Sequence, residues 1–123
     1  MKKLIKTWNG RGIQDDGAYV SKEFSSFYRQ FINAVKREFP DDEVVNCNKG
    51  HYYLFGFIKR GTKFVYFSYY VPRGGLSIDM ARSDALRGIL IRKAHNEKDY
   101  TGEDNHFTSF FHFKENVEYL FRK

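Results

Sequence analysis

Residue types that carry catalytic or metal chemistry are present in the chain, but their spacing does not build a site. The four histidines, His51, His95, His106 and His112, lack the i, i+4 pairing and the cysteine partners of a zinc site. Cys47 stands alone with no charged residue beside it, so we expect an unreactive structural thiol. The sequence therefore predicts no metal and no other cofactor.

Nuclease chemistry would need clustered carboxylates and a lysine. The segment Pro40–Glu43 supplies acids, but it follows an expected helix, where turn residues are usual, and no Asp/Glu-x-Lys triplet occurs in the chain. Nucleophile-elbow, Walker and dinucleotide-binding motifs are missing too. The glycine-rich segment "PRGGLS" is followed by no lysine, and we interpret it as a turn. These patterns favour a protein that is not an enzyme.

Positive charge is concentrated in one part of the sequence. The chain has a formal net charge of +6, and the segment Lys59–Lys98 alone accounts for it, with nine basic and three acidic residues. Such a localised field attracts nucleic acid or an acidic protein face, although a solvated basic surface that only aids solubility fits as well. The basic residues are Lys59, Arg60, Lys63, Arg73, Arg82, Arg87, Arg92, Lys93 and Lys98.

Aromatic residues are interleaved with these cations. The stretch "RGTKFVYF" (Arg60–Phe67) resembles the RNP1 signature of RNA-recognition motifs, but Thr62 and Lys63 replace its first aromatic residue and its small residue. The order of helices and strands also differs from that fold, so a basic aromatic hairpin is the favoured interpretation. Rings such as Tyr66 and Tyr69, beside the cations, are suited to gripping single-stranded nucleic acid.

The elements that position these residues follow from hydrophobic periodicity. Apolar residues spaced by three and four predict an amphipathic helix over Lys22–Phe39, with Ser21 as its N-cap and Pro40 ending it. A short helix is expected in "FKENVEYLFRK" at the C-terminus. The apolar stripe of the first helix is Phe24, Phe27, Phe31, Ile32, Val35 and Phe39.

The middle of the chain has the composition of an antiparallel meander. "VVNCN", "HYYLFGFI", "KFVYFSYYV" and "GILIRKA" are short, rich in aromatic and β-branched residues, and separated by turn signals. A further short strand is possible at Leu4–Trp8. We therefore expect one α+β domain over residues 1–123: an antiparallel three- to five-stranded sheet with an N-terminal amphipathic helix and a short C-terminal helix. Either facing of Phe64–Tyr70 leaves large rings without cover, which suggests a binding face or a homodimer interface.

The start of the sequence and the single cysteine bear on location. "MKKLIKTWNG" contains no apolar core of a signal peptide, and nowhere do about 18 apolar residues run together. One cysteine suits a reducing compartment. We expect a cytoplasmic protein without a membrane partner.

A polar segment, "NEKDYTGEDN" (Asn96–Asn105), separates two apolar stretches. Asp99 is expected to accept hydrogen bonds from the amides of Thr101 or Gly102, and Gly102 is free to adopt a positive φ. With these three residues shaping the turn, Tyr100 is presented at the tip or folded back onto the core. The same pattern fits an ordered exposed loop with no further role.

The stretch "ILIRKAHNEKDYTGEDNHFTS", with "KGHYYLFGF" and "KFVYFS" before it, resembles small proteins carried by phages, plasmids and integrative elements of Gram-positive bacteria. The resemblance covers roughly residues 50–121, and His95 and Glu103 stand where lysine and glycine are typical. Some proteins of this sort are similar to type II-A anti-CRISPRs, which inhibit an RNA-guided DNA nuclease. The resemblance implies a non-enzymatic inhibitor in the host cytoplasm that binds the nuclease, its guide RNA, or both.

Two hypotheses follow: a stoichiometric nuclease inhibitor that blocks guide assembly, target loading or cleavage, and a general nucleic-acid-binding accessory protein of a phage or plasmid. A basic protein is a poor mimic of DNA, so contact with guide RNA or an acidic patch on the nuclease is expected. The residues expected to bind the partner are Lys59, Arg60, Lys63, Tyr66, Tyr69, Arg73, Arg82, Arg87, Arg92, Lys93, Lys98 and Tyr100.

Overall fold

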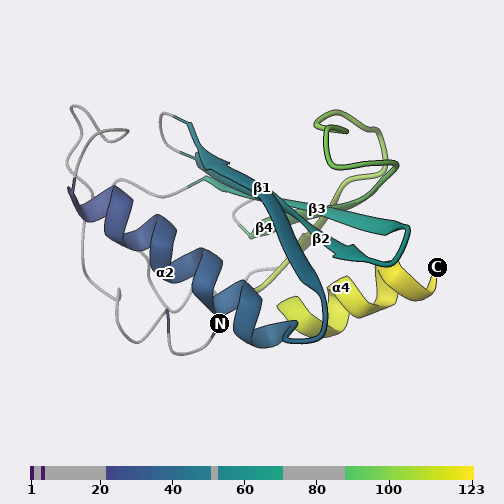
Figure 1. The fold of residues 1–123 in the computed structure, drawn as a ribbon, viewed down its shortest axis with the longest axis horizontal. Helices are drawn as coiled ribbons and strands as arrows, with labels where there is room; N and C mark the ends of the chain where they lie inside the picture. The colour runs from purple at the N-terminus through teal and green to yellow at the C-terminus, as the bar shows by residue number, and fades with distance from the viewer. Residues whose placement is uncertain (2–3, 5–21, 51–52, 71–87) are drawn as a thin grey trace.

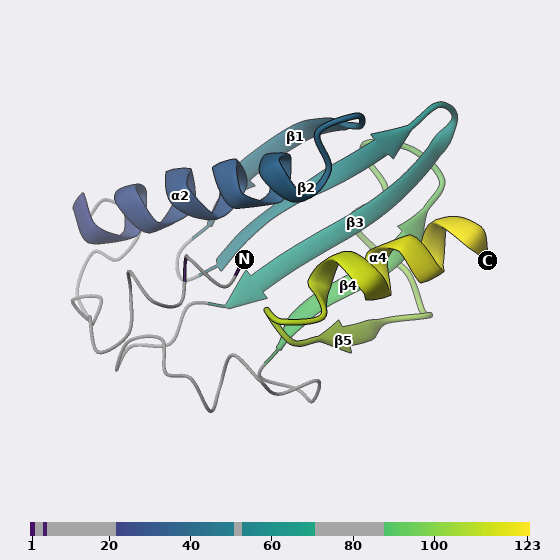
Figure 2. The same cartoon turned by 90° about the horizontal axis from the view of Figure 1, so that it is seen from below.

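The computed structural model describes residues 1, 4, 22–50, 53–70 and 88–123. In these residues five antiparallel strands form a meander in which neighbours in sequence are neighbours in the sheet. The two described long helices, at residues 22–38 and 113–122, lie on the same face of that sheet (Figures 1 and 2). The α+β fold is confirmed. Its elements are α2 (Lys22–Glu38), β1 (Glu43–Lys49), β2 (Tyr53–Arg60), β3 (Lys63–Tyr70), β4 (Ile89–Ala94), β5 (His106–Thr108) and α4 (Phe113–Arg122).

The two helices follow the expected apolar periodicity. In α2, which ends one residue earlier than expected, the whole stripe from Phe24 to Phe39 is buried. Phe31 lies at the centre of this core, with its ring centroid 5.8 Å from those of Tyr69 and Phe110 and 6.2 Å from that of Phe67. The helix α4 buries the four residues Phe113, Val117, Leu120 and Phe121.

Alternation along β3 decides which aromatic rings belong to the core. Val65, Phe67 and Tyr69 point toward the helices and are buried, whereas Tyr66 and Tyr70 lie on the opposite face of the sheet. Tyr66 and Tyr69 therefore cannot contact a partner through the same surface, because side chains alternate between the two faces of a sheet along a strand. Burial raises the pKa of Tyr69. The expectation that Tyr69 binds a partner is corrected: it is a core residue.

Three smaller expectations change as well. The strand β5 was not foreseen as a separate element. The RNP1-like stretch Arg60–Phe67 is divided between two strands by the β2–β3 turn, where Gly61 adopts φ 62°, and so it does not form the single strand of an RNA-recognition motif. Of the strand considered at Leu4–Trp8, only Leu4 is described, and it has a helical backbone and is buried.

Among the described residues, no helix is both long enough and apolar enough to cross a membrane.

Candidate partner-binding surface

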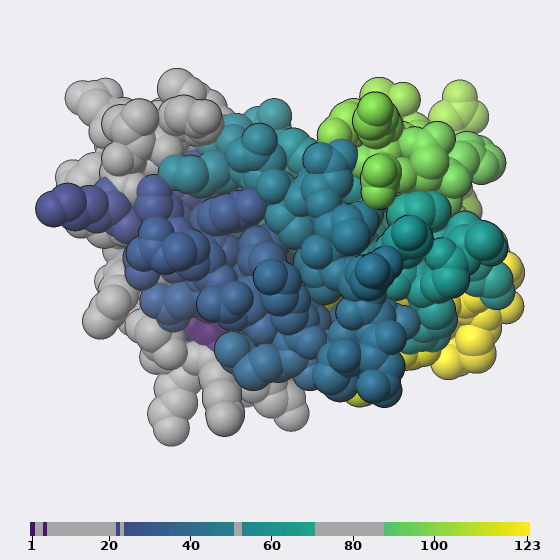
Figure 3. All heavy atoms as spheres, viewed as in Figure 1, coloured from purple at the N-terminus to yellow at the C-terminus, as the bar shows by residue number. Residues whose placement is uncertain are grey.

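The connection between β4 and β5 folds back over the sheet face opposite α2 and α4. We call residues 95–105 the strap. In Figure 1 the strap rises above the sheet while α2 and α4 lie below it, and in Figure 3 it forms a projection at one end of the molecule. The polar segment of the sequence is therefore not a simple link between strands.

Asn46 holds the strap from the far edge of the sheet. It lies at a β-bulge in β1, where its φ of 50° is one that asparagine tolerates better than most residues. Its Nδ2 donates to the hydroxyl oxygen of Tyr100 at 2.7 Å and also to the main-chain oxygen of Glu97. Because Asn46 and Tyr100 are 54 residues apart, this contact fixes the strap to the folded sheet.

The internal turn of the strap differs from the expected one. The side chain of Asn96 accepts the amide of Lys98 at 2.8 Å, which is an Asx turn. Asp99 accepts the amide of His95 at 3.0 Å, so it bonds backward along the chain and not to Thr101 or Gly102. Thr101 is exposed and has no hydrogen bond among the described residues. Asn96 and Asp99, and not Thr101, shape the turn.

Gly102 is required for a close approach and not for a special backbone angle. Gly61, and not Gly102, has positive φ among the described glycines, so the expected positive φ of Gly102 is wrong. A Cβ at position 102 would lie 2.6 Å from Cδ and 2.8 Å from Nε of Arg92. The strap backbone therefore rests directly on the Arg92 side chain.

Arg92 is an anchor beneath the strap. Only 2% of it is exposed, so the expectation that it belongs to an accessible basic surface is corrected. Its Nη2 donates to the main-chain oxygen of Asp99 at 3.1 Å, and Nη1 lies 3.6 Å from the Asp99 carboxylate. The guanidinium also stacks on Tyr66, with Cζ 4.7 Å from the ring centroid. Alternation along "ILIRKA" places the side chain of Arg92 on the sheet face opposite that of Ile91. Its burial on that face depends on the strap.

The strap creates a second, smaller aromatic cluster. Phe57 is fully buried although it lies on the face opposite the helices. Its ring centroid is 5.2 Å from that of Tyr66 and 5.6 Å from that of Tyr100, and Tyr100 also meets Phe55 edge-on at 5.5 Å. Burial raises the pKa of Tyr66. The strap therefore covers part of the aromatic surface on this face of the sheet, and Tyr100 remains 45% exposed at the rim.

At the other end of this face the rings stay more open. Tyr53 faces Tyr70 across β2 and β3 with centroids 5.4 Å apart, and Tyr53 stacks on Phe55 at 6.0 Å. Tyr70 is 73% exposed. The open face therefore runs from this tyrosine pair to the rim of the strap at Tyr100.

Most of the described basic residues that were expected to bind a partner make contacts within the protein. Arg60 donates two hydrogen bonds to Asp42 at 3.0 and 2.7 Å and two to Glu118 at 2.8 and 2.7 Å. Its guanidinium also stacks on Phe121 with Cζ 4.3 Å from the ring centroid. Arg60 thereby joins the α2–β1 corner to α4. It is a structural clamp whose charge is compensated.

Two lysines serve the C-terminal end of α4. Nζ of Lys63 donates to the main-chain oxygen of Phe121 at 3.1 Å, and Nζ of Lys93 donates to that of Lys123 at 2.8 Å. The last carbonyls of a helix have no partner within the helix, and they carry the negative end of its dipole. Both lysines therefore cap α4.

The remaining cations divide into three groups. Lys59 lies 3.7 Å from Glu43 and over the ring of Phe64. Lys98, on the strap, has no charged or hydrogen-bonded partner for its ammonium group among the described residues. The remaining three, Arg73, Arg82 and Arg87, lie outside the described residues.

Replacing Glu118 by Gln should lower stability in a pH-dependent way. The hydrogen bond from Arg60 lowers the pKa of Glu118. A carboxylate whose pKa is lowered by folding stabilises the folded state at pH values above the ordinary glutamate pKa of about 4.3. This stabilisation is lost as the pH falls through the pKa of Glu118 in the folded protein. The side chains of Arg60 and Glu118 are 37% and 26% exposed, so solvent weakens their interaction. We therefore expect Glu118→Gln to lower the free energy of unfolding by only about 1 kcal/mol at pH 7. Urea unfolding at pH 7, 5 and 3.5 measures it.

The difference between wild type and Glu118→Gln should shrink toward pH 3.5. Glu115→Gln, on the exposed side of the same helix, serves as the control and should change stability little at any of these pH values. A difference for Glu118→Gln that stays constant from pH 7 to pH 3.5 would contradict this assignment.

Cys47 should react slowly with thiol reagents in the folded protein. It is half-buried at the β1 bulge, where a Cβ on Gly56 would come within 2.6 Å of its Sγ, and burial raises its pKa to about 11. The thiolate is the reactive form, so a rise from 9.0 to 11 predicts roughly 100-fold slower reaction at pH 8 than in the unfolded chain. Reaction with a chromogenic disulfide with and without urea tests this, and equal rates would refute it.

Histidines and carboxylates do not gather into a metal site in the part of the chain that is described, where no group of three or more potential ligands occurs. His106 lies 3.4 Å from Asp104, and the pKa of Asp104 is lowered mainly by Lys123 and then by His106. His51 lies outside the described residues.

Comparison of the chain with protein-family models, curated proteins and solved structures found no match.

Proposed function

We propose that this protein is a non-enzymatic, stoichiometric inhibitor of a type II-A RNA-guided CRISPR nuclease. The observation that carries the proposal is the strap. Within the stretch that resembles anti-CRISPR proteins, Arg92, Asp99 and Gly102 hold the strap against the sheet, and Asn96 shapes its turn. Asn46, outside that stretch, binds the strap from β1. The fixed strap holds Lys98 and Tyr100 at an exposed rim. A surface ordered before binding loses less conformational entropy on association, which favours affinity.

The chemistry of the rim favours a protein partner. Tyrosine is enriched among residues that dominate protein interfaces, and Tyr100 continues into the open rings of Phe55, Tyr53 and Tyr70. Among the described residues of the strap, Lys98 is exposed and carries a positive charge. We therefore place the contact on the nuclease protein, with the blocked step being guide assembly, target loading or cleavage.

The second hypothesis, general nucleic-acid binding, receives less support. Phosphate backbones are held by several free cations at once. Arg60, Lys63, Arg92 and Lys93 instead bind carboxylates or carbonyls of this protein. Reversing their charge would damage the fold and would not report on binding. Variants at Lys98 and Tyr100 are the informative ones.

The proposal is tested by DNA cleavage with purified nuclease, guide RNA and target, with this protein added before or after guide loading. We expect inhibition that is complete near one equivalent. The double variant Lys98→Glu, Tyr100→Ala should weaken inhibition by at least 10-fold. Tyr119→Ala, at an exposed tyrosine on α4, is the matched control and should inhibit normally.

Two outcomes would overturn the proposal. One is cleavage that is unaffected at a tenfold excess of the protein. The other is retention of unrelated RNA or DNA with steep salt dependence and without any binding to the nuclease, which would establish the nucleic-acid hypothesis instead.

A further inference from the structure

The hydrogen bond between Asn46 and Tyr100 has a direction that the surrounding chemistry fixes. Nδ2 of Asn46 lies 2.7 Å from the hydroxyl oxygen of Tyr100 and also contacts the main-chain oxygen of Glu97. A main-chain oxygen only accepts hydrogen bonds, so the atom of the Asn46 amide that faces it is the nitrogen and not the oxygen. The same nitrogen supplies the second N–H to Tyr100. The hydroxyl oxygen of Tyr100 is therefore an acceptor within the protein.

This bond leaves the hydroxyl proton of Tyr100 unused. A phenol both donates and accepts, and no acceptor for its proton is found among the described residues. A hydroxyl group that accepts a hydrogen bond is polarised and becomes a better donor. Tyr100 is 45% exposed, so a partner can reach it. The rim of the strap thus carries a strengthened hydrogen-bond donor that folding does not satisfy.

The backbone at Asn46 is unusual in a way that points to a positioning role. Asn46 alone among the described non-glycine residues has a positive φ, and it lies at the β1 bulge. Bulges often redirect a side chain next to a functional site, and unusual backbone angles concentrate at such sites. Here the side chain of Asn46 reaches the strap, while its neighbour Cys47 packs against the main core.

The charges of the strap bear on the kind of acceptor that fits. Its acidic residues are Glu97, Asp99, Glu103 and Asp104, and its one lysine is Lys98. Asp99 lies 3.6 Å from Arg92, and Asp104 lies 3.6 Å from Lys123. The exposed Glu97 and Glu103 then outnumber Lys98. A carboxylate or a phosphate that approached Tyr100 would be repelled, and a neutral carbonyl oxygen would not.

We propose that Tyr100 donates a hydrogen bond to a main-chain carbonyl oxygen of the nuclease, and that Asn46 is the positioning residue that reserves the hydroxyl group for this role. The assignment rests on the proposed function and adds to it the chemical group that the strap recognises. A donor that is held ready selects partners that present an acceptor and penalises those that leave it unpaired.

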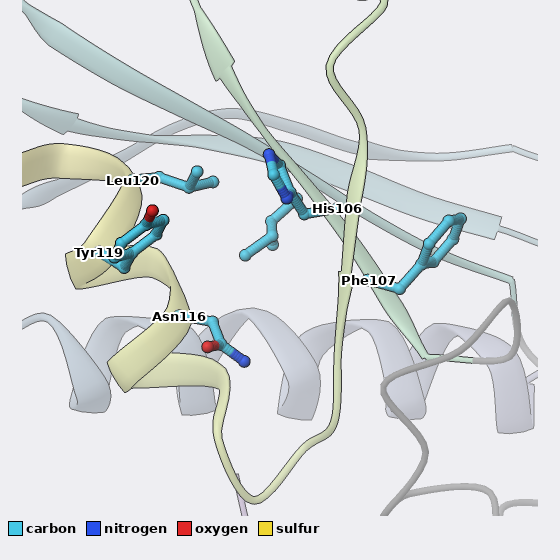
Figure 4. Close-up of a pocket in the computed structure, with 6 residues that line it drawn as sticks. His106, Phe107, Asn116, Tyr119 and Leu120 are labelled. Atoms are coloured by element: carbon cyan, nitrogen blue, oxygen red, sulfur yellow. The ribbon is translucent and has the colours of Figure 1, made fainter. Parts of the chain in front are cut away.

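Tyr119 is a matched control on the other side of the sheet. It is 55% exposed, and it borders a pocket of about 310 Å³ between α4 and β5 (Figure 4). The nearby amide of Asn116 donates to Oγ1 of Thr108 at 2.8 Å and not to the hydroxyl group of Tyr119. The two exposed tyrosines therefore differ in whether an asparagine amide binds the hydroxyl oxygen.

The experiment measures the affinity of the nuclease for this protein with ring-fluorinated tyrosines at position 100, at a pH where the hydroxyl group stays protonated. Each added fluorine makes the hydroxyl group more acidic, and so a stronger donor and a weaker acceptor. Affinity should rise along the series, equally at low and high salt because the acceptor is neutral. Tyr100→Phe should weaken binding about 3–10-fold. The same changes at Tyr119 should have no effect.

A second measurement needs no nuclease. In the NMR spectrum, Tyr100→Phe should shift one side-chain N–H signal of Asn46, and the one bonded to Glu97 should stay in place. Hydrogen exchange at the amides of His95 and Lys98 reports whether the strap remains folded in every variant.

Three results would overturn the assignment: affinity that falls with fluorination while the strap stays folded, a fluorine effect that disappears at high salt, or Asn46 signals that ignore Tyr100→Phe. A wild-type protein that does not bind the nuclease would instead overturn the proposed function, and the partner's carbonyl group with it. Wild-type binding combined with a reversed fluorine series would overturn this assignment alone. The two failures are therefore distinguishable.

Discussion

Phe31→Ala is expected to lower the free energy of unfolding by about 3–5 kcal/mol, because it removes a fully buried ring from the centre of the helix–sheet core. The ring contacts aromatic partners from α2, β3 and the segment before α4, so no single neighbour can move to fill the cavity. The total free energy of unfolding of a small domain is about 5–15 kcal/mol, so this loss would leave the fold only marginally stable. Urea unfolding followed by circular dichroism measures it.

A control on the same helix separates cavity formation from a change in helix propensity. Asn33 is exposed on α2, and Asn33→Ala should change stability by less than about 1 kcal/mol. If Phe31→Ala cost as little as Asn33→Ala, Phe31 would not be at the centre of the core.

Gly102→Ala should displace the strap while leaving the main core intact. The new methyl group would lie 2.6–2.9 Å from three atoms of the buried Arg92 side chain, and overpacking of this kind costs about 1–3 kcal/mol. The strap can move more readily than the strand β4, so it should absorb the change. Hydrogen exchange should accelerate at the amides of His95 and Lys98, which are bonded within the strap turn.

The same variant tests whether the strap is the working surface. If Lys98 and Tyr100 contact the nuclease, Gly102→Ala should weaken inhibition by about 10-fold or more without lowering the unfolding midpoint of the core in proportion. Glu103→Ala, at the adjacent exposed position, is the control and should leave both readouts unchanged. Unchanged exchange at His95 and Lys98 in Gly102→Ala would show that the strap does not rest on Arg92.

The parts of the fold that could be predicted are those determined by local periodicity. The stripe of α2, the ends of β2 and β3 around Gly61, and the apolar face of α4 all depend on residues close in sequence. The β5 strand was not anticipated because three residues carry no measurable alternation, and its pairing with β4 depends on the strap between them.

The candidate site was less predictable because its contacts join distant parts of the chain. Charge counting suggested a free basic patch, but it could not show that Arg60 meets Glu118, or that Lys63 and Lys93 reach the end of α4. In the same way, Asn46 looked like an ordinary strand residue, and only the folded chain places it against Tyr100. Lys98 and Tyr100, which the sequence places among the partner-binding residues, are both exposed on the strap, and their role in binding stays a prediction.

The meander has a consequence for the order of events in folding. Short connections join β1 to β2 and β2 to β3, so these three strands can assemble before distant segments meet. The contacts of Arg60 with Glu118 and of Asn46 with Tyr100 span more than 50 residues and close only when the C-terminal part of the chain has docked. If they form after the transition state, substitutions there should speed unfolding and leave the rate of folding nearly unchanged.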